Sequence, residues 1–152
     1  MAVKPIPDGL HSVTPYLVVE GAGQLLDFIQ QAFDGKVTER MEGPNGKIGH
    51  AEVRIGDSVV MLGETSSRSK PTTSAIYLYV NDTDAAYKRA LQSGATSVME
   101  PADQFYGDRN AGVQDPAGNF WWIATHVEDV APDEMKRRAE AHMKKQTQAQ
   151  SA

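Results

Sequence analysis

The apolar and polar positions in the first half of the chain follow two different periods. One apolar, β-branched run, a short strand candidate, one cleanly alternating run and a further apolar run are typical of strands. Between the first two of these runs lies a segment with helical spacing that ends before Gly35. The order β-α-β-β-β is therefore predicted. We expect these elements at residues 12–19, 24–33, 36–42, 47–56 and 58–64.

The same order recurs in the second half, after the polar segment TSSRSKPTT. A strand pattern leads into a helical pattern that begins near Asp82 and stops at Gly94. The segment PADQFYGDR, residues 101–109, is expected to form a loop, and DPAG a hairpin turn. Two similar units indicate internal duplication. We expect the second set of elements at residues 75–80, 82–94, 96–100, 110–115 and 119–126.

These patterns predict an α+β fold of two tandem β-α-β-β-β units in a single domain over residues 1–130. The half-units are expected at about 11–64 and 75–127, with a linker at 65–74. Residues 131–152 begin with Pro132 and two acidic residues and become basic later, which suits a helix. They lack a strong apolar stripe, so we expect a helical or disordered tail.

Composition excludes several kinds of partner and site. A formal net charge of -5 argues against a nucleic-acid partner, which favours a basic surface. The absence of cysteine excludes thiolate metal sites and cysteine nucleophiles. No apolar run approaches the roughly 20 residues that span a bilayer, and no signal peptide is evident at the N-terminus. We therefore expect a cytoplasmic protein without a membrane partner.

Four segments resemble the vicinal oxygen chelate superfamily, which includes glyoxalase I, bleomycin-resistance proteins and extradiol dioxygenases. They are TPYLVVEGAGQLLDFIQQAF, GKIGHAEVRIGDSVVMLGE, ATSVMEPADQFYGDR and VQDPAGNFWWIATHVEDV. The chain looks most like the PhnB-like or glyoxalase-like branch. The resemblance implies curled mixed sheets around a cleft, helices on the convex face and a ligand on the concave face. Many members complete the cavity either across a dimer or by pairing the two halves, and from this resemblance we expect a homodimer.

The resemblance also places the metal ligands of metal-dependent relatives on the first and last strand of each half. The corresponding residues here are Thr14, Met61, Ala75 and Trp122. These side chains do not make a ligand set for a divalent cation, which prefers imidazole, carboxylate or thiolate donors. A shift of one residue does not restore a ligand set. We therefore expect no metal at these positions and no other cofactor.

His50, Glu52 and Arg54 share one face of the strand predicted at 47–56, opposite an apolar face. One interpretation is an ordinary solvated strand surface. The other is a polar pocket wall in which His50 and Glu52 transfer a proton. A metal site at His50 and Glu52 is a further, less favoured alternative. The remaining histidines show no metal-binding spacing and are expected at the surface.

Aromatic residues are expected on the cavity side of other strands by the same alternation. Tyr77 and Tyr79 share a face with Ala75, and Trp122 shares one with Phe120. Such rings either fill the core or form an aromatic pocket that binds planar or cationic ligands. The predicted ligand-binding residues are Tyr16, Arg54, Met61, Tyr77, Tyr79, Tyr106, Arg109, Phe120 and Trp122.

Arg109 has two interpretations. It either binds a ligand carboxylate or phosphate, or forms an ion pair with Asp108 or Asp115 that braces the loop.

Three functions remain open from the sequence. The leading hypothesis is a metal-free protein of the glyoxalase/bleomycin-resistance type that binds a small organic molecule in an aromatic cleft. The alternative is a glyoxalase-like lyase or isomerase that uses His50 and Glu52 for proton transfer, with Arg109 or tyrosines stabilising an oxyanion. The third is a protein that has lost its ligand and acts by binding a partner. Whether the protein is an enzyme is not decided at this level.

Overall fold

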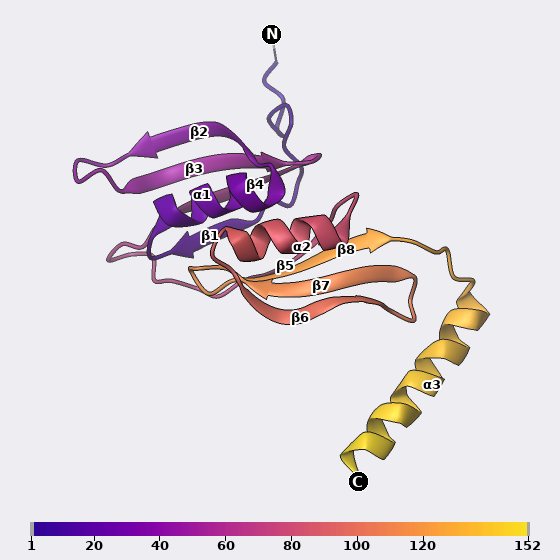
Figure 1. The fold of residues 1–152 in the computed structure, drawn as a ribbon. Coiled ribbons are helices and arrows are strands. Elements are labelled where there is room, and N and C mark those ends of the chain that lie inside the picture. The colour runs from indigo at the N-terminus through magenta and orange to yellow at the C-terminus, as the bar shows by residue number, and fades with distance from the viewer. Residues whose placement is uncertain (1, 152) are drawn as a thin grey trace.

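A computed structural model describes residues 2–151 and shows an α+β fold with two four-stranded mixed sheets (Figure 1). In the first sheet the strand order is β1-β4-β3-β2, with β1 parallel to β4 and the other pairs antiparallel. The first half of the chain has the predicted order β-α-β-β-β. Its elements are β1 (Tyr16–Val19), α1 (Ala22–Phe33), β2 (Lys36–Glu42), β3 (Ile48–Ile55) and β4 (Ser58–Glu64).

The second half repeats this topology with the strand order β5-β8-β7-β6. Corresponding strands also pair in the same register. Tyr16 pairs with Met61 in the first sheet, and Tyr77 pairs with Trp122 in the second. The elements of the second half are β5 (Ala75–Tyr79), α2 (Thr83–Gln92), β6 (Thr96–Asp103), β7 (Asp108–Gln114) and β8 (Phe120–His126).

The expected loop at 101–109 is largely strand, which corrects the sequence prediction. β6 continues through Pro101 to Asp103, and β7 already begins at Asp108. β6 is an edge strand that pairs only with β7, and an edge strand tolerates a proline because its missing N–H can face away from the partner. Asp108 and Arg109 are therefore strand residues, whose side chains point to opposite faces of the sheet.

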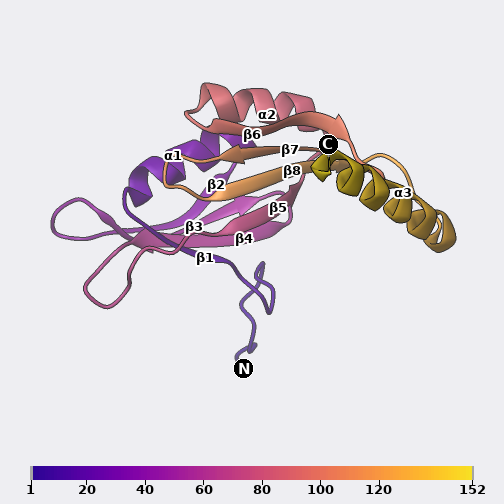
Figure 2. The ribbon, with the colours of Figure 1, turned by 90° about the horizontal axis from the view of Figure 1, so that it is seen from below.

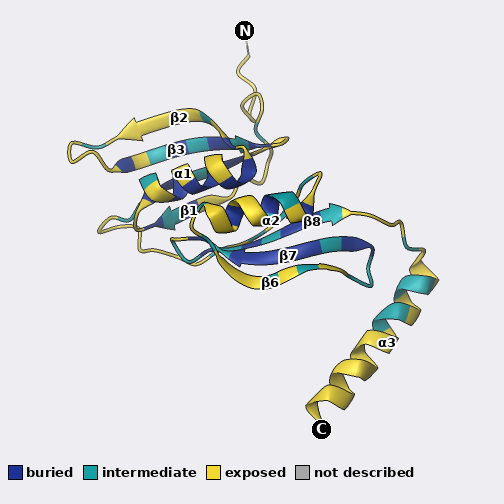
Figure 3. Ribbon diagram, viewed as in Figure 1, coloured by how far each residue is buried: buried dark blue, intermediate teal, exposed yellow. Residues whose placement is uncertain are grey.

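Each sheet has one face covered by its helix and one face that is not; we call the latter the open face. On β3, Ala51, Val53 and Ile55 are buried on the helix-covered face. Figure 3 shows that buried and less buried positions alternate along this strand. In the second sheet, Trp121 has the corresponding orientation and is fully buried. Its ring centroid lies 4.8 Å from that of Phe33 on α1. The helix-covered faces of the two halves thus share one hydrophobic core.

The shared core determines the direction of the open faces. α1 and α2 lie next to each other in both views (Figures 1 and 2), and Arg89 on α2 donates to the carbonyl oxygen of Ala32 on α1 at 3.3 Å. Because both helix-covered faces contribute to the same core, the open faces point away from it and from each other. Residues on the two open faces of one chain therefore do not line a common cleft.

The tail forms the helix α3 (Pro132–Gln150), which extends away from the two sheets (Figure 1). Arg138 attaches its first half to the body by donating to the Glu128 carboxylate at 2.8 and 2.9 Å and to the carbonyl oxygen of Phe105 at 3.1 Å. None of the α3 residues is fully buried. In the part of the chain that the structure describes, no helix combines the length and apolar character that a membrane crossing needs.

Candidate functional site

The open face of the second sheet gathers most of the predicted aromatic residues. Tyr77 and Tyr79 project there from β5, and Trp122 and Phe120 from β8. Tyr106 joins them from the short connection between β6 and β7 through a hydrogen bond to Asn110. The structure therefore brings together the predicted aromatic residues of the second half.

Asp108 is the buried carboxylate on this face, and its side chain is only 5% exposed. Its Oδ2 accepts hydrogen bonds from the hydroxyls of Tyr77 at 2.8 Å and Tyr79 at 2.9 Å, and its Oδ1 lies 2.9 Å from Nδ1 of His126. Burial raises the pKa of Asp108, but the hydrogen bonds from His126 and the two tyrosines outweigh it, so the net pKa is lowered. The carboxylate therefore stays charged and orients all three partners.

The pKa values of Tyr77, Tyr79 and His126 are raised, in contrast to the lowered pKa of Asp108. Burial is the main cause that raises the pKa of Tyr77, and the hydrogen bond that its hydroxyl donates to Asp108 adds to it. The pKa of Tyr79 is raised chiefly by its hydrogen bond to Asp108. The pKa of His126 is raised by hydrogen bonds to Asp108 and then to Asp129, whose Oδ1 lies 2.8 Å from Nε2. The tyrosines thus remain neutral hydroxyl groups at ordinary pH.

A chain of amides continues this network toward Tyr106. Gln104 donates to Oδ1 of Asn110 at 3.0 Å, and Nδ2 of Asn110 donates to the Tyr106 hydroxyl at 2.7 Å and to the Tyr77 hydroxyl at 3.2 Å. Asn110 is 4% exposed, so its orientation is set by these partners. Because Asn110 donates to the Tyr106 oxygen, the Tyr106 hydroxyl proton can be donated to a ligand.

Some of these residues line a pocket of about 330 Å³ on the open face, whereas Tyr79 and Phe120, although predicted to bind the ligand, are not among its lining residues. Its volume lies near the lower end of the range for small-molecule sites, roughly 300–1,000 Å³. It combines the Trp122 ring with convergent hydroxyl and amide groups, which is the composition expected of such sites. Its lining residues are Tyr77, Met99, Gln104, Tyr106, Asn110 and Trp122.

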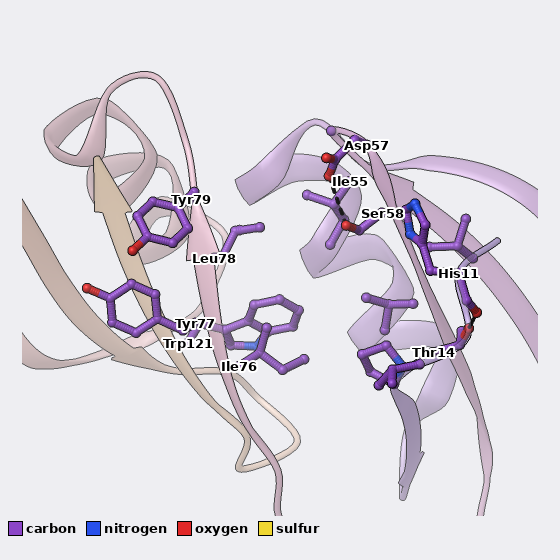
Figure 4. Close-up of a pocket in the computed structure, with 15 residues that line it drawn as sticks. His11, Thr14, Ile55, Asp57, Ser58, Ile76, Tyr77, Leu78, Tyr79 and Trp121 are labelled. Atoms are coloured by element: carbon purple, nitrogen blue, oxygen red, sulfur yellow. Dashed lines mark hydrogen bonds between the residues drawn. The ribbon is translucent and has the colours of Figure 1, made fainter. Parts of the chain in front are cut away.

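A larger pocket of about 600 Å³ lies between the two halves (Figure 4). Ile76, Leu78 and Trp121 point into it from the second half, while Tyr77 and Tyr79 point away from the first half. Its walls are mainly the apolar side chains that continue the core. Polar groups sit at its margin, where Ser58 donates to Asp57 at 2.9 Å. Size alone therefore does not identify the site, and the smaller pocket has the more specific chemistry.

The open face of the first sheet carries the predicted polar residues His50, Glu52 and Arg54. The Tyr16 hydroxyl lies 3.1 Å from Nδ1 of His50, and Nε2 of His50 lies 3.5 Å from Oε1 of Glu52. Arg54 instead contacts the N-terminal segment, where it donates to the carbonyl oxygen of Gly9 at 3.3 Å. Met61 pairs with Glu52 on the neighbouring strand. None of these residues reaches the pocket beside Trp122.

Arg109 lies on the opposite face of β7 from Asp108 and does not line the pocket. Its Nε and Nη2 donate to the two carboxylate oxygens of Asp84 at 2.7 and 2.8 Å, and Nη1 donates to Asp103 at 3.1 Å. The hydrogen bonds to Asp84 and then Asp103 raise the pKa of Arg109. An ion pair was one of the two sequence interpretations, but its expected partners were wrong. Asp115 instead accepts from Nε1 of Trp121 at 2.8 Å.

Sequence reasoning missed Gln104, Asn110, His126 and Glu39, which take part in these networks. Asn110 bonds to Tyr77 and Tyr106, His126 bonds to Asp108, and Glu39 lies opposite Glu52 on β2. The alternation of β7 could have placed Asn110 beside Asp108 if the strand had been predicted to begin two residues earlier. To place Glu39 near His50, one must know the β2–β3 register, and this register shifts between Val37 and Glu39.

The positions at which metal-dependent relatives carry ligands do not fit a metal. Thr14 precedes β1, Ala75 begins β5, and Met61 and Trp122 lie within β4 and β8. A neutral hydroxyl, a thioether, a methyl and an indole do not make a ligand set for a divalent cation in such a site. The chemistry of these side chains therefore offers no centre of the usual kind at these four positions.

Comparison with solved structures shows the same fold in other proteins. TioX from Micromonospora sp. ML1 is similar with a TM-score of 0.62 and 22% identity, over 76% of this chain and 100% of that one. PA1353 from Pseudomonas aeruginosa is similar with a TM-score of 0.64 and 17% identity, over 78% of this chain and 99% of that one. At these identities the likeness concerns the fold alone.

Sequence comparison identifies the family. Rv0887c, an uncharacterized protein of Mycobacterium tuberculosis strain H37Rv, is 38% identical in an alignment 138 positions long that covers 82% of this chain and 80% of the relative. The sequence pattern of the Glyoxalase/Bleomycin resistance protein/Dioxygenase superfamily matches residues 9–123. The chain therefore belongs to this superfamily, the vicinal oxygen chelate group that its sequence resembles.

Proposed function

We propose that the protein binds a small, planar organic molecule on the open face of the second sheet, without a metal at the positions used by metal-dependent relatives. The observation that carries the proposal is the pocket in which Trp122 lies beside the oriented hydroxyl and amide groups of Tyr77, Tyr106 and Asn110. A family whose members bind small molecules supports it.

The pocket chemistry favours a planar ring that carries a hydrogen-bond acceptor. The Trp122 ring offers a stacking surface, and the Tyr106 hydroxyl and the Gln104 amide offer donors at its edge. Asp108 already accepts three hydrogen bonds from protein groups, so it acts on the ligand through the tyrosines rather than by direct contact. A carbonyl or ring nitrogen is therefore the expected acceptor on the ligand.

A homodimer is part of this proposal. The open faces of one chain point away from each other, and they expose aromatic rings: Tyr16 is 45% exposed, Tyr77 43% and Tyr79 60%. Burial of such rings against a second copy would stabilise the pair and exclude water from the ligand. In the proposed dimer, the first sheet of one copy faces the second sheet of its partner.

The test uses the two tryptophans as separate reporters, since the chain contains only these two. Trp121 is buried in the core and Trp122 lines the pocket. In the Trp121→Phe variant we expect a planar ligand from a panel of aromatic carbonyl and heterocyclic compounds to quench the remaining emission saturably. In Trp122→Phe the quenching should disappear. Equal quenching in both variants, or none from any compound in Trp121→Phe, would contradict the proposal.

Tyr106→Phe provides the matched test of the donor. It keeps the ring and removes the hydroxyl, and we expect affinity to fall by about tenfold, the effect of losing one hydrogen bond of about 1.4 kcal/mol.

A lyase or isomerase remains the second candidate because Tyr16, His50 and Glu52 form a hydrogen-bonded row on the first sheet. In that function His50 takes a proton from the substrate and Glu52 stabilises the resulting imidazolium. His50→Gln would then abolish turnover while ligand binding at Trp122 persists. Binding without detectable turnover by the unaltered protein would exclude this candidate.

A further inference from the structure

Glu39, His50 and Glu52 converge on the open face of the first sheet. One donor atom from each side chain lies within 4.8 Å of the other two. The β2–β3 register brings Glu39 directly opposite Glu52, and His50 lies two residues before Glu52 on the same face. The His50 and Glu52 side chains are only 21% and 18% exposed. Two half-buried side chains and the exposed side chain of Glu39 therefore bring three metal-ligating groups together.

Tyr16 orients the imidazole of His50 through the ring nitrogen that does not face the carboxylates. The Tyr16 hydroxyl lies 3.1 Å from Nδ1, and the two rings are in contact with centroids 5.6 Å apart. Nε2 consequently points toward the carboxylates, 3.5 Å from Oε1 of Glu52. A histidine that ligates a metal through one ring nitrogen usually has its second nitrogen fixed by a hydrogen bond in this manner. Tyr16 lies outside the three ligating residues and is an independent sign of that orientation.

Two carboxylates of like charge face each other at this position. Like charges directly opposite each other on antiparallel strands are unfavourable, and Glu39 and Glu52 are such a pair. The cationic side chains on the neighbouring positions have other partners. Arg54 donates to Gly9, and Arg40 donates to Glu42 at 2.9 Å. Among the described residues, neither Glu39 nor Glu52 has a salt bridge to lysine or arginine.

We propose that Glu39, Nε2 of His50 and Glu52 bind a first-row divalent cation such as Zn²⁺. Bonds of about 2.1 Å place two ligand atoms of a tetrahedral ion about 3.4 Å apart. The His50–Glu52 separation of 3.5 Å already matches this spacing, and a donor atom of Glu39 lies within 4.8 Å of one from each of the other two side chains. One imidazole and two carboxylates are donors that suit such an ion, and they leave a position open for water or a ligand.

This site differs from the one that the family resemblance implies. The ligands lie on β2 and β3, the two strands at one side of the first sheet, whereas metal-dependent relatives use the first and last strands of each half. The inference does not depend on the proposed ligand site, because that pocket lies on the other sheet. It also competes with the proton-transfer alternative, since Nε2 of His50 cannot ligate a cation and accept a proton at the same time.

The experiment measures Zn²⁺ binding to full-length protein freed of metal with a chelator. Isothermal titration should show one Zn²⁺ per chain for the unaltered protein. Glu39→Gln and His50→Gln should each weaken it at least about tenfold, the lower end of the effect of disturbing a metal site. Glu42→Gln and His11→Gln remove the same chemical groups elsewhere and should leave affinity unchanged. Circular dichroism and thermal unfolding check that each variant is folded.

A spectroscopic readout identifies the ligating atom. On addition of Zn²⁺, the Nε2 resonance of His50 in a ¹⁵N-edited NMR spectrum should shift, while that of His11 should not. Tyr16→Phe should weaken binding by about tenfold because it releases the ring. The proposal is overturned if no Zn²⁺ binds, or if binding is unchanged in both Glu39→Gln and His50→Gln.

Discussion

At the scale of single residues, Asp108 organises the open face of the second sheet. It is buried, and it accepts hydrogen bonds from Tyr77, Tyr79 and His126. Its position explains why the tyrosines do not simply fill the core. A tyrosine hydroxyl needs a hydrogen-bond acceptor, and the charged Asp108 carboxylate supplies one on the open face. The two rings therefore stay at this face instead of packing into the core.

His126 should make the stability of the protein depend on pH. Its folded-state pKa is raised from the ordinary 6.5, first by Asp108 and then by Asp129. The stabilisation is therefore complete below about pH 6.5 and is lost as the pH rises through the raised value. In urea unfolding, we expect the stability advantage of the unaltered protein over His126→Gln to shrink from mildly acidic to mildly alkaline pH.

The control for this series is His11→Gln, which removes an exposed histidine near the N-terminus. The Asp108 carboxylate does not alter the sign, because its lowered pKa places its own transition at acidic pH. A pH-independent difference between the unaltered protein and His126→Gln would contradict the assigned hydrogen bonds.

At the scale of elements, the pairing of β7 with β8 shapes the pocket. Gly112 on β7 lies directly opposite Trp122 on β8. A Cβ atom at Gly112 would lie 2.8 Å from Cε3 of the indole, closer than van der Waals contact allows. The absence of a side chain at Gly112 therefore lets the Trp122 ring lie over the strand and present its other face to the pocket.

Gly112→Ala should displace the Trp122 ring. In the Trp121→Phe background, we expect a shifted emission maximum, weaker quenching by the ligand and a loss of about 1–3 kcal/mol of stability from overpacking. Gly49→Ala on β3 is the matched control, because its added Cβ would meet only an ordinary contact at 3.8 Å. If Gly112→Ala keeps the emission and the affinity of its parent, the indole does not lie as described.

At the scale of the whole molecule, the shared core separates the two open faces. The helix-covered faces meet through α1, α2 and Trp121, so the predicted polar residues near His50 and aromatic residues near Trp122 are on different surfaces of one chain. The single cleft expected from the sequence would need two copies. The dimer, the ligand and the cytoplasmic location remain predictions.

The proposed dimer gives a test on the first sheet. Met41 is 53% exposed and pairs with His50 across the open face. Met41→Lys would place a charge in the interface, and we expect at least a tenfold weaker dimer in sedimentation velocity, since burial of an unpaired charge is costly. Leu91→Lys on the outer side of α2, where the residue is 37% exposed, should have no effect. A monomeric unaltered protein at high concentration would refute the dimer.

The sequence by itself determined the order of elements and the face to which each strand residue points. Both follow from local periods, because side chains alternate along a strand whatever its neighbours are. His50, Glu52 and Arg54 could thus be placed on one face, and Tyr77 and Tyr79 on another. Pro101 misled the prediction because a proline ends most strands but is tolerated on an edge strand, and only pairing decides which strand is the edge.

Only the tertiary structure decided which residues from different elements meet. Glu39 reaches His50 through an irregular register between β2 and β3, and Arg109 finds Asp84 on α2, 25 residues away. The direction of the open faces depends on how the two halves pack, because burial of both apolar faces in one core fixes their relative orientation. Strand register and the packing of the two halves depend on contacts between residues far apart in the sequence, so the local periods along the chain do not determine them.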